Sequence, residues 1–272
     1  MKTDNTYANL LRLIQEEGSY RKDRTGVGTM SVFSEHVTFD LREGFPILQG
    51  KSVHWKSVVG ELLWFISGDT RVKTLQDMGV TIWNEWALED GTIGPGYGRC
   101  WRSWETKDGK FIDQLGDVIE QIKANPTSRR LVVNSWNVGE LDNMALPPCH
   151  MFFQFYVSNG WIDLQMYQRS ADSFLGVPFN ISSYALLLSM VAQVTGLKPR
   201  KLHMTFGDLH IYSNHEDAVE EYLGRVESRT SITKPPSLKL NPDIKSIDDF
   251  TVDDIQLDNY NPMPRIKAPV AV

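Results

Sequence analysis

The stretch Ala145-Leu146-Pro147-Pro148-Cys149-His150-Met151-Phe152-Phe153-Gln154-Phe155-Tyr156 places a thiol after two prolines and before an aromatic run. Proline fixes its own φ and steers the preceding residue away from the helical region, so the chain reaches Cys149 through a stiff turn. The bulky residues that follow favour a β-strand. We therefore expect Cys149 at the start of a strand. It is either a positioned nucleophile or a buried structural cysteine, because free cysteine is among the most buried residue types.

The segments around this stretch alternate helix and strand patterns. Ser158-Asn159-Gly160 lies between two strand-like runs and is typical of a hairpin turn. Apolar spacing predicts strands at 30–41, 131–136, 151–157, 161–167 and 201–212, and helices at 7–17, 52–67, 112–124, 180–196 and 215–224. With no repeat or composition break, this mixture predicts one α+β domain over residues 1–272, built on a mainly antiparallel mixed sheet packed with helices.

The composition excludes several classes of protein. The chain has 272 residues, 41% hydrophobic and 23% charged, and its net charge of −6 argues against a surface for general nucleic-acid binding. Cys100 and Cys149 form no CxxC pair, and no histidine cluster indicates a metal site. The polar N-terminus and the lack of an apolar run of about 18 residues predict a reduced, cytoplasmic protein outside membranes.

Four arginines in loops or at strand edges suggest a phosphate site. Each arginine alone is more often a solvated surface charge, but guanidinium groups match phosphate oxygens bidentately. Together with a placed cysteine they indicate a thiol enzyme acting on a phosphorylated small molecule, and arginines near Cys149 would lower its pKa. The four are Arg24, Arg129, Arg130 and Arg169.

Two further residues carry competing interpretations. Glu61 lies within an apolar helical pattern, where a carboxylate needs a partner or a function; otherwise it lies on the polar edge of its helix. His150 follows Cys149 directly and suggests a Cys-His hydrolase. Neighbours on a strand point to opposite faces, however, so His150 is a poor candidate to deprotonate Cys149.

Motifs spread along the chain fall together in the order and spacing of the thymidylate synthase family, which the sequence resembles from about Arg24 to its last residue. The motifs are Asp23-Arg24-Thr25-Gly26, Glu61-Leu62-Leu63-Trp64-Phe65, Ser128-Arg129-Arg130, Pro147-Pro148-Cys149-His150, Tyr167-Gln168-Arg169-Ser170, Phe174-Leu175-Gly176-Val177-Pro178-Phe179-Asn180, Gly207-Asp208-Leu209-His210-Ile211-Tyr212 and Ala268-Pro269-Val270-Ala271-Val272.

The resemblance implies a folate-dependent enzyme that acts on dUMP. Cys149 would attack C6 of uracil, so that C5 takes the one-carbon unit of 5,10-methylenetetrahydrofolate, giving dTMP and dihydrofolate. The resemblance also implies catalytic roles for Glu61, Tyr97, His150, Asn180 and Asp172. An amide at Asn180 suits the acceptor O4 and donor N3–H of uracil, whereas cytosine presents the reverse edge.

The remaining implied sites concern binding. The nucleotide would be held by Arg24, Arg169, Ser170, Asp172, Asn180, His210 and Tyr212, with Arg129 and Arg130 donated from the partner subunit of a sheet-mediated homodimer. The folate would be lined by His54, Ile82, Trp83, Leu146, Asp172, Gly176 and Ala271, and no metal is implied.

Five positions depart from the family pattern and keep alternatives open. They are Gln49-Gly50, Gly96, Cys100 and Ser173. Smaller or more polar residues near the folate would admit water, so the runner-up is a dUMP hydroxymethylase that yields 5-hydroxymethyl-dUMP and tetrahydrofolate. A homologue that binds nucleotide without catalysis is a third possibility, and a cysteine hydrolase ranks below it.

Overall fold

A six-stranded mixed sheet forms the frame of the molecule, and the computed structural model describes residues 2–228 and 234–270. All neighbouring strands run antiparallel except β7 and β8, which are parallel because α6 crosses between them. The strand order is β1 (Ser19–Arg21), β2 (Thr29–Asp40), β8 (Lys198–Tyr212), β7 (Trp161–Asp172), β6 (His150–Ser158) and β5 (Val132–Asn134). The predicted α+β class with a mixed, mainly antiparallel sheet is confirmed.

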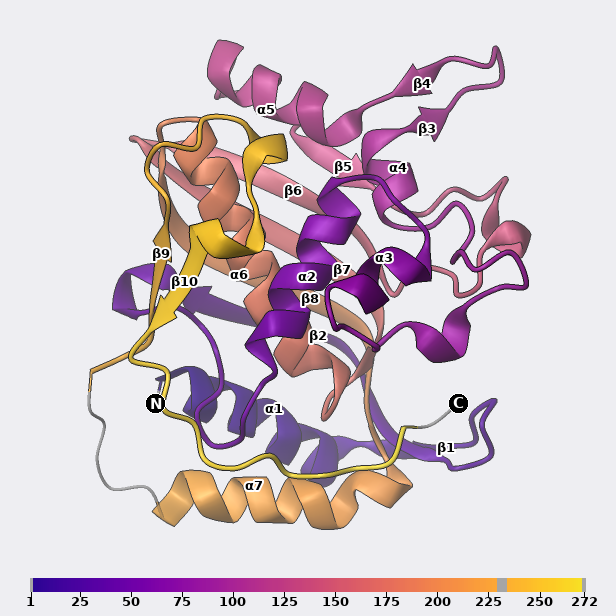
Figure 1. Ribbon diagram of the computed structural model, residues 1–272. Helices are drawn as coiled ribbons and strands as arrows, with labels where there is room; N and C mark the ends of the chain where they lie inside the picture. Colours follow the sequence, from indigo (N-terminus) through magenta and orange to yellow (C-terminus); the bar gives the residue numbers. More distant parts are fainter. Residues whose placement is uncertain (1, 229–233, 271–272) are drawn as a thin grey trace.

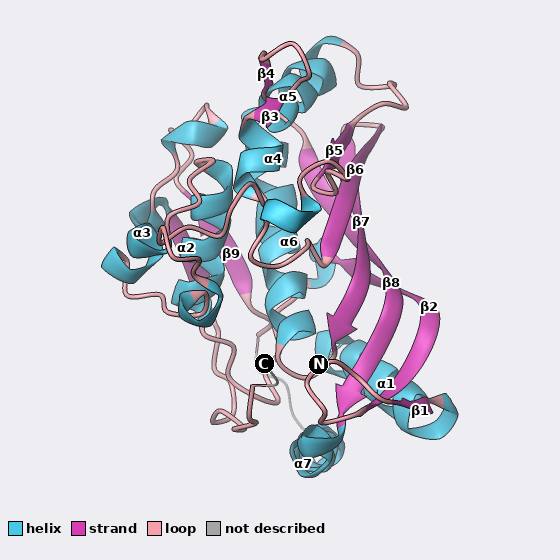
Figure 2. Ribbon diagram, turned by 90° about the vertical axis from the view of Figure 1, so that its right-hand side faces the viewer, coloured by secondary structure: helices cyan, strands magenta, loops and turns pink. Residues whose placement is uncertain are grey.

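Helices α2, α4 and α6 lie on one side of the strands, whereas the opposite face of the central strands is left open (Figure 2). Two short hairpins accompany the main sheet: β3 (Trp104–Glu105) with β4 (Phe111–Ile112), and β9 (Ser237–Leu240) with β10 (Ile255–Asp258). Figure 1 shows α1 and α7 together at the lower end of the molecule. The helices are α1 (Lys2–Glu17), α2 (Trp55–Ile66), α3 (Val72–Asp77), α4 (Gly98–Arg102), α5 (Gln114–Ala124), α6 (Gly176–Val194) and α7 (Glu216–Ser228).

The hairpin predicted at Ser158-Asn159-Gly160 is confirmed. Asn159 and Gly160 both have left-handed φ angles, 52° and 77°, which a two-residue turn between β6 and β7 requires. The sheet's covered face carries the apolar side chains of the central strands. Phe153 and Phe155 of β6 and Met166 of β7 are buried there.

Helix α6 is the centre of the covered side, and it begins four residues earlier than the sequence pattern predicts. Pro178 falls in its first turn, where a missing N–H is tolerated. An oxygen of Asp172 accepts the N–H groups of Phe174 (2.9 Å) and Leu175 (3.1 Å) just before the helix. The spacing of apolar residues cannot predict a helix start that depends on a side chain of the preceding strand.

Helix α6 is also long and apolar enough by composition to cross a membrane, but 78% of that window is buried inside the protein. The described chain contains no other such helix. Burial on this scale identifies α6 as a core helix, which must be apolar around most of its surface.

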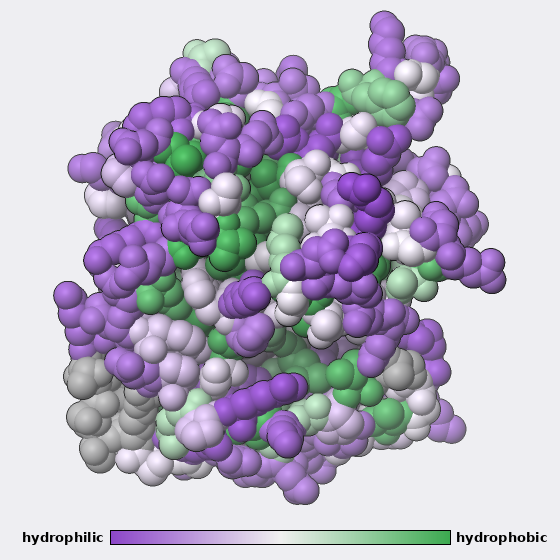
Figure 3. All heavy atoms as spheres, viewed as in Figure 1, coloured by the Kyte–Doolittle hydropathy of each residue, from purple (hydrophilic) through white to green (hydrophobic). Residues whose placement is uncertain are grey.

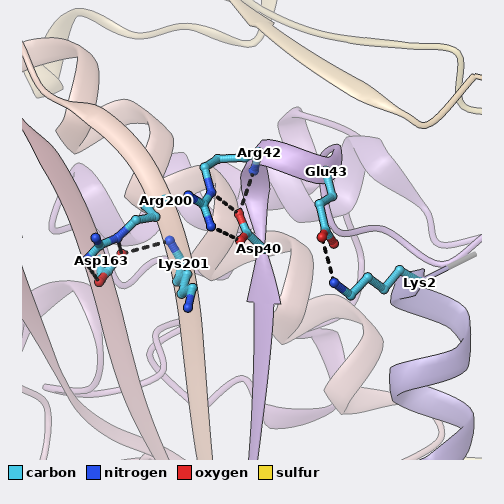
Figure 4. A network of polar contacts seen from close by, with 7 residues as sticks. All are labelled: Lys2, Asp40, Arg42, Glu43, Asp163, Arg200 and Lys201. Atoms are coloured by element: carbon cyan, nitrogen blue, oxygen red, sulfur yellow. Dashed lines mark hydrogen bonds and ion pairs between the residues drawn. The ribbon is translucent and has the colours of Figure 1, made fainter.

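Charged residues fix the ends of β2, β7 and β8 (Figure 4). The β7–β8 register shifts between Ile162 and Leu164, and Asp163 at that bulge is buried. Its carboxylate accepts two bonds from the Arg200 guanidinium (2.9 and 2.6 Å) and one from the backbone N–H of Lys201 (3.0 Å). The bulge is therefore held by a bidentate ion pair.

Candidate active site

The turn before β6 holds Cys149, a free and half-buried thiol. The backbone N–H of Cys149 donates to the Tyr97 hydroxyl (2.9 Å), and its carbonyl accepts the backbone N–H of Arg169 (2.8 Å). The Arg169 guanidinium donates to the carbonyls of Pro147 (2.7 Å) and Pro148 (2.9 Å). The stiff turn predicted from the two prolines is thus also tied from β7.

The protonation of Cys149 differs from the expectation. Burial raises the pKa of the thiol, and the positive charge of Arg169 opposes this shift without reversing it. Arg169 lowers the pKa of Cys149 as predicted, but the net shift in the free protein is upward, because the loss of water outweighs one guanidinium. The resting group is a thiol that needs proton acceptors when it reacts.

Tyr97 has an unusual backbone conformation. Its φ is 32° and ψ is −96° at the residue before α4, a region that L-residues rarely occupy. Its buried ring stacks on Phe65 (centroids 4.8 Å apart) and lies against His150 (4.4 Å). A strained residue held by its surroundings often marks a functional position, and here it points the hydroxyl at the Cys149 turn.

Glu61 lies inside the protein on α2, so the interpretation as a polar-edge residue was wrong. One carboxylate oxygen accepts the indole N–H of Trp83 (2.7 Å). Burial raises the pKa of Glu61 to about 7, while the bond from Trp83 lowers it. Near neutral pH the carboxyl therefore populates both protonation states, as an acid-base group requires.

His150 is a buried neutral side chain. Its Nδ1 shares a hydrogen bond with the Tyr184 hydroxyl (2.7 Å), and burial lowers the pKa of His150 to about 3. A base of this strength does not take the proton of Cys149 near neutral pH. His150 therefore cannot serve as the general base that the Cys-His hydrolase interpretation requires.

Asn180 lies near the start of α6, and its orientation is set by a residue that sequence reasoning missed. Its Oδ1 accepts the side-chain N–H of Gln168 (3.1 Å), which faces His150 across β6 and β7. The Nδ2 group and a second lone pair of Oδ1 then remain available, the donor and acceptor that a uracil edge needs. The position of Gln168 next to Arg169 in the motif 167–170 was the sequence signal that could have identified it.

The carboxyl ends of β7 and β8 bring three further predicted residues together. Asp172 pairs in register with His210, and Tyr212 lies two residues beyond on β8. His210 Nδ1 bonds Asp208 (2.9 Å), which also accepts from Ser31 and Arg21. Asp208 was not predicted, although its spacing of two from His210 puts both on one face of a strand.

The phosphate arginines divide into two kinds. Arg169 is half-buried and bonded, and Ser170 is half-buried beside it. Arg24, in the loop before β2, and Arg129 and Arg130, between α5 and β5, are exposed. Within residues 2–228 and 234–270 no hydrogen bond or ion pair holds these three guanidinium groups. The structure therefore does not join them to the Cys149 cluster.

The residues predicted to line the folate form a less uniform set. Trp83 is buried against the Tyr97 ring (centroids 5.7 Å), and Ile82, Leu146 and Gly176 are half-buried. Asp172 is half-buried, whereas His54 is exposed at the start of α2. Ala271 lies outside the described residues.

Four of the five departures from the family pattern can be compared by their surroundings. A Cβ on Gly50 would come within 2.7 Å of the Tyr222 ring, so this position leaves no space for water, contrary to expectation. A Cβ on Gly96 would meet only Ile93 at 3.7 Å, which is ordinary contact. Ser173 donates to the His210 carbonyl (2.6 Å) and Cys100 to that of Pro95 (3.2 Å). Of the two glycines, only Gly96, beside Tyr97, has room for an added Cβ.

The structure thus brings together a tethered thiol, a buried carboxyl whose pKa is about 7 and an oriented amide. No group of His, Cys, Asp or Glu in the described chain is arranged to hold a metal ion. The family model for thymidylate synthase matches residues 5–272. The chain therefore belongs to the thymidylate synthase family, whose members transfer a one-carbon unit from methylenetetrahydrofolate to dUMP.

Proposed function

We propose that this protein is the synthase of its family. It converts dUMP and 5,10-methylenetetrahydrofolate to dTMP and dihydrofolate through a covalent bond between Cys149 and C6 of uracil. The observation that carries this proposal is the joined cluster of Cys149, Tyr97, Trp83 and Glu61, in which each residue bonds or packs against the next. Such a cluster fixes a nucleophile and a proton carrier on one ring.

The chain's own residues account for the first step. Cys149 loses its proton and its sulfur bonds to C6, while the electron pair of the C5–C6 double bond moves toward O4. The Nδ2 group of Asn180 donates to that oxygen, and Gln168 keeps the amide oriented. C5 then becomes the nucleophile that takes the one-carbon unit.

The later steps need a proton acceptor and a dry site. After the one-carbon unit is bonded, C5 loses its proton, which Glu61 and Tyr97 relay through ordered water. Bound methylenetetrahydrofolate would supply both the one-carbon unit and the hydride that completes the methyl group. The bond between Cys149 and C6 then breaks, which restores the C5–C6 double bond and releases dTMP. Trp83 is held against Tyr97. Its indole would lie beside the reacting carbon and favour hydride over water there.

The nucleotide phosphate completes the site in a homodimer. Arg24, Arg169 and Ser170 would bind it from one chain, with His210 and Tyr212 on the deoxyribose, and Arg129 and Arg130 would reach it from the partner. The open face of the sheet would be the interface, since its exposed aromatic side chains, such as Tyr156 at 63% exposure, need a cover. A single catalytic domain over residues 1–272 and a cytoplasmic location belong to the same proposal.

One observation favours the second candidate, dUMP hydroxymethylase. The unused space at Gly96 lies next to Tyr97, where a water molecule would reach the same intermediate. The test is stoichiometric: purified protein is given dUMP and methylenetetrahydrofolate, with the nucleotide identified by mass and the folate by absorbance. One dihydrofolate for each dTMP supports the synthase. Formation of 5-hydroxymethyl-dUMP with tetrahydrofolate overturns it in favour of the hydroxymethylase, and Gly96→Val is then the first variant to make.

A further inference from the structure

His215 is a fully buried histidine for which the proposed reaction has no use. It ends the turn between β8 and α7. Its ring packs against Tyr212 (centroids 5.5 Å apart) and Phe174 (5.8 Å). Tyr212 belongs to the proposed nucleotide site, and Phe174 follows Asp172 at the start of α6.

The two ring nitrogens of His215 face different groups. Nε2 lies 2.7 Å from the carbonyl oxygen of Pro269, and because a carbonyl only accepts, Nε2 carries the hydrogen. Nδ1 has no hydrogen-bond partner among the described residues and lies 3.7 Å from a carboxylate oxygen of Asp172. An unpaired buried nitrogen is rare in folded proteins and indicates a constraint other than local stability.

The C-terminal segment runs above α7 toward the end of the molecule (Figure 1). Its earlier part is well anchored: Met263 donates to the Gln49 carbonyl (2.8 Å), and the Pro264 carbonyl accepts from Arg225 (2.6 Å). From 265 to 270, the bond to His215 is the one hydrogen bond found within the described chain. On this side of the molecule hydrophobic atoms gather toward the middle, inside a hydrophilic margin (Figure 3).

We propose that His215 is a positioning residue that fastens the C-terminal segment, residues 265–270, to the site. It bonds the C-terminal segment, which leads to the predicted folate residue Ala271, and packs against Tyr212 of the proposed nucleotide position. The inference rests on the proposed function for its ligands. The contact between His215 and Pro269 itself is present without any ligand.

The chain allows a matched pair of variants. A glutamine amide reaches about as far as Nε2 and keeps a donor for Pro269, whereas an asparagine amide reaches only as far as Nδ1. His215→Gln and His215→Asn are both polar and smaller than histidine, so they perturb the core alike. Each is made in the full chain and in a chain that ends at Ala268, with the thermal midpoint measured for all.

The first readout needs no nucleotide or folate. Carboxypeptidase Y should release the terminal residues about fivefold or more faster from the full-length His215→Asn protein than from His215→Gln, since cleavage follows the population of the open segment. Equal rates in the two folded variants overturn the fastening. This result is independent of whether the protein acts on dUMP.

The second readout is the Kd of tetrahydrofolate for the protein saturated with dUMP. His215→Asn should raise it about tenfold over His215→Gln, the size of one hydrogen bond. In chains that end at Ala268 the two variants should bind alike, because their common partner is gone. A difference that persists in the short chain means a local structural role and overturns the coupling. A wild-type protein that binds no tetrahydrofolate contradicts the proposed function instead.

Discussion

The base side and the phosphate side of the site are built differently. Around Cys149 each functional group is tied to another residue of the same chain: Tyr97 to the Cys149 N–H, Glu61 to Trp83, and Asn180 to Gln168. On the phosphate side, Arg24, Arg129 and Arg130 extend into solvent without such ties. One chain thus supplies a finished surface for a base, but of its predicted phosphate arginines only Arg169 is held in place within the described chain.

The difference shows which interactions need a ligand or a second chain. Buried polar groups must find partners within the fold, since an unpaired one costs about 1–3 kcal/mol. Exposed guanidinium groups form hydrogen bonds with water and remain available to bind an anion. Changes on the base side should therefore disturb chemistry and stability inside one chain, whereas the loss of Arg129 or Arg130 should be repaired by another chain.

The largest expected effect is the loss of the nucleophile. Cys149→Ala should bind dUMP but lower turnover by about four orders of magnitude or more, since covalent catalysis is removed. Cys100→Ala is the matched control. Burial raises the pKa of Cys100 to about 12, so it stays a thiol and its loss should spare the covalent step. Steady-state kinetics and mass detection of the dUMP adduct check both, and wild-type turnover in Cys149→Ala would refute the assignment.

The next effect concerns the choice of base. Asn180→Asp should shift the ratio of kcat/KM for dUMP to dCMP by about a hundredfold toward dCMP, because two mismatched polar pairs are exchanged for matched ones. Competition between the two nucleotides measures the ratio. Gln168→Leu removes the hydrogen bond that orients the Asn180 amide. It should reduce the preference for dUMP over dCMP without reversing it. An unchanged ratio in Asn180→Asp would mean that another residue reads the base.

The phosphate side offers a test by complementation. Arg129→Ala alone and Cys149→Ala alone should each be poorly active, whereas a mixture that exchanges subunits should recover about a quarter of wild-type activity. Half of the dimers are then mixed, and each mixed dimer has one complete site. Arg24→Ala in place of Arg129→Ala is the control, because Arg24 serves its own chain and the site that keeps Cys149 would lack it. A verified mixed dimer without recovered activity would place Arg129 in its own site.

The last prediction is on stability rather than activity and concerns Glu61. Its pKa is about 7 in the folded protein against a usual 4.5, so between these pH values the native state binds more protons than the unfolded chain. The contribution of Glu61 to stability therefore falls as pH rises from 4.5 to 7, by about 3 kcal/mol in all.

Glu61→Gln removes this term, so its free energy of unfolding relative to wild type should be more favourable at pH 8 than at pH 4. Urea titrations at both pH values measure it. Trp83→Phe deletes the bond that lowers the pKa of Glu61. The stability that this variant loses between pH 4.5 and pH 8 should therefore be larger than the loss in the wild type. A mutant difference that does not change with pH would show that Glu61 is not held as an unfavourable buried carboxyl.

The sequence by itself determined the local framework. Two prolines set the turn before Cys149, the 158–160 turn closed the β6–β7 hairpin, and the spacing of the motifs identified the family. Each of these signals acts within a few residues or is carried by residue identity alone, so none of them needs the fold. The start of helix α6 was not predicted correctly, because its first turn depends on the side chain of Asp172 on the preceding strand.

The tertiary structure decided how the site behaves. Burial by residues distant in sequence raises the pKa values of Cys149 and Glu61 and lowers that of His150, three shifts that no local pattern encodes. Contacts across strands and helices likewise chose Gln168 as the partner of Asn180 and aimed His215 at Pro269. Desolvation and long-range hydrogen bonds depend on what surrounds a group in space, and the chain acquires those surroundings only when it folds.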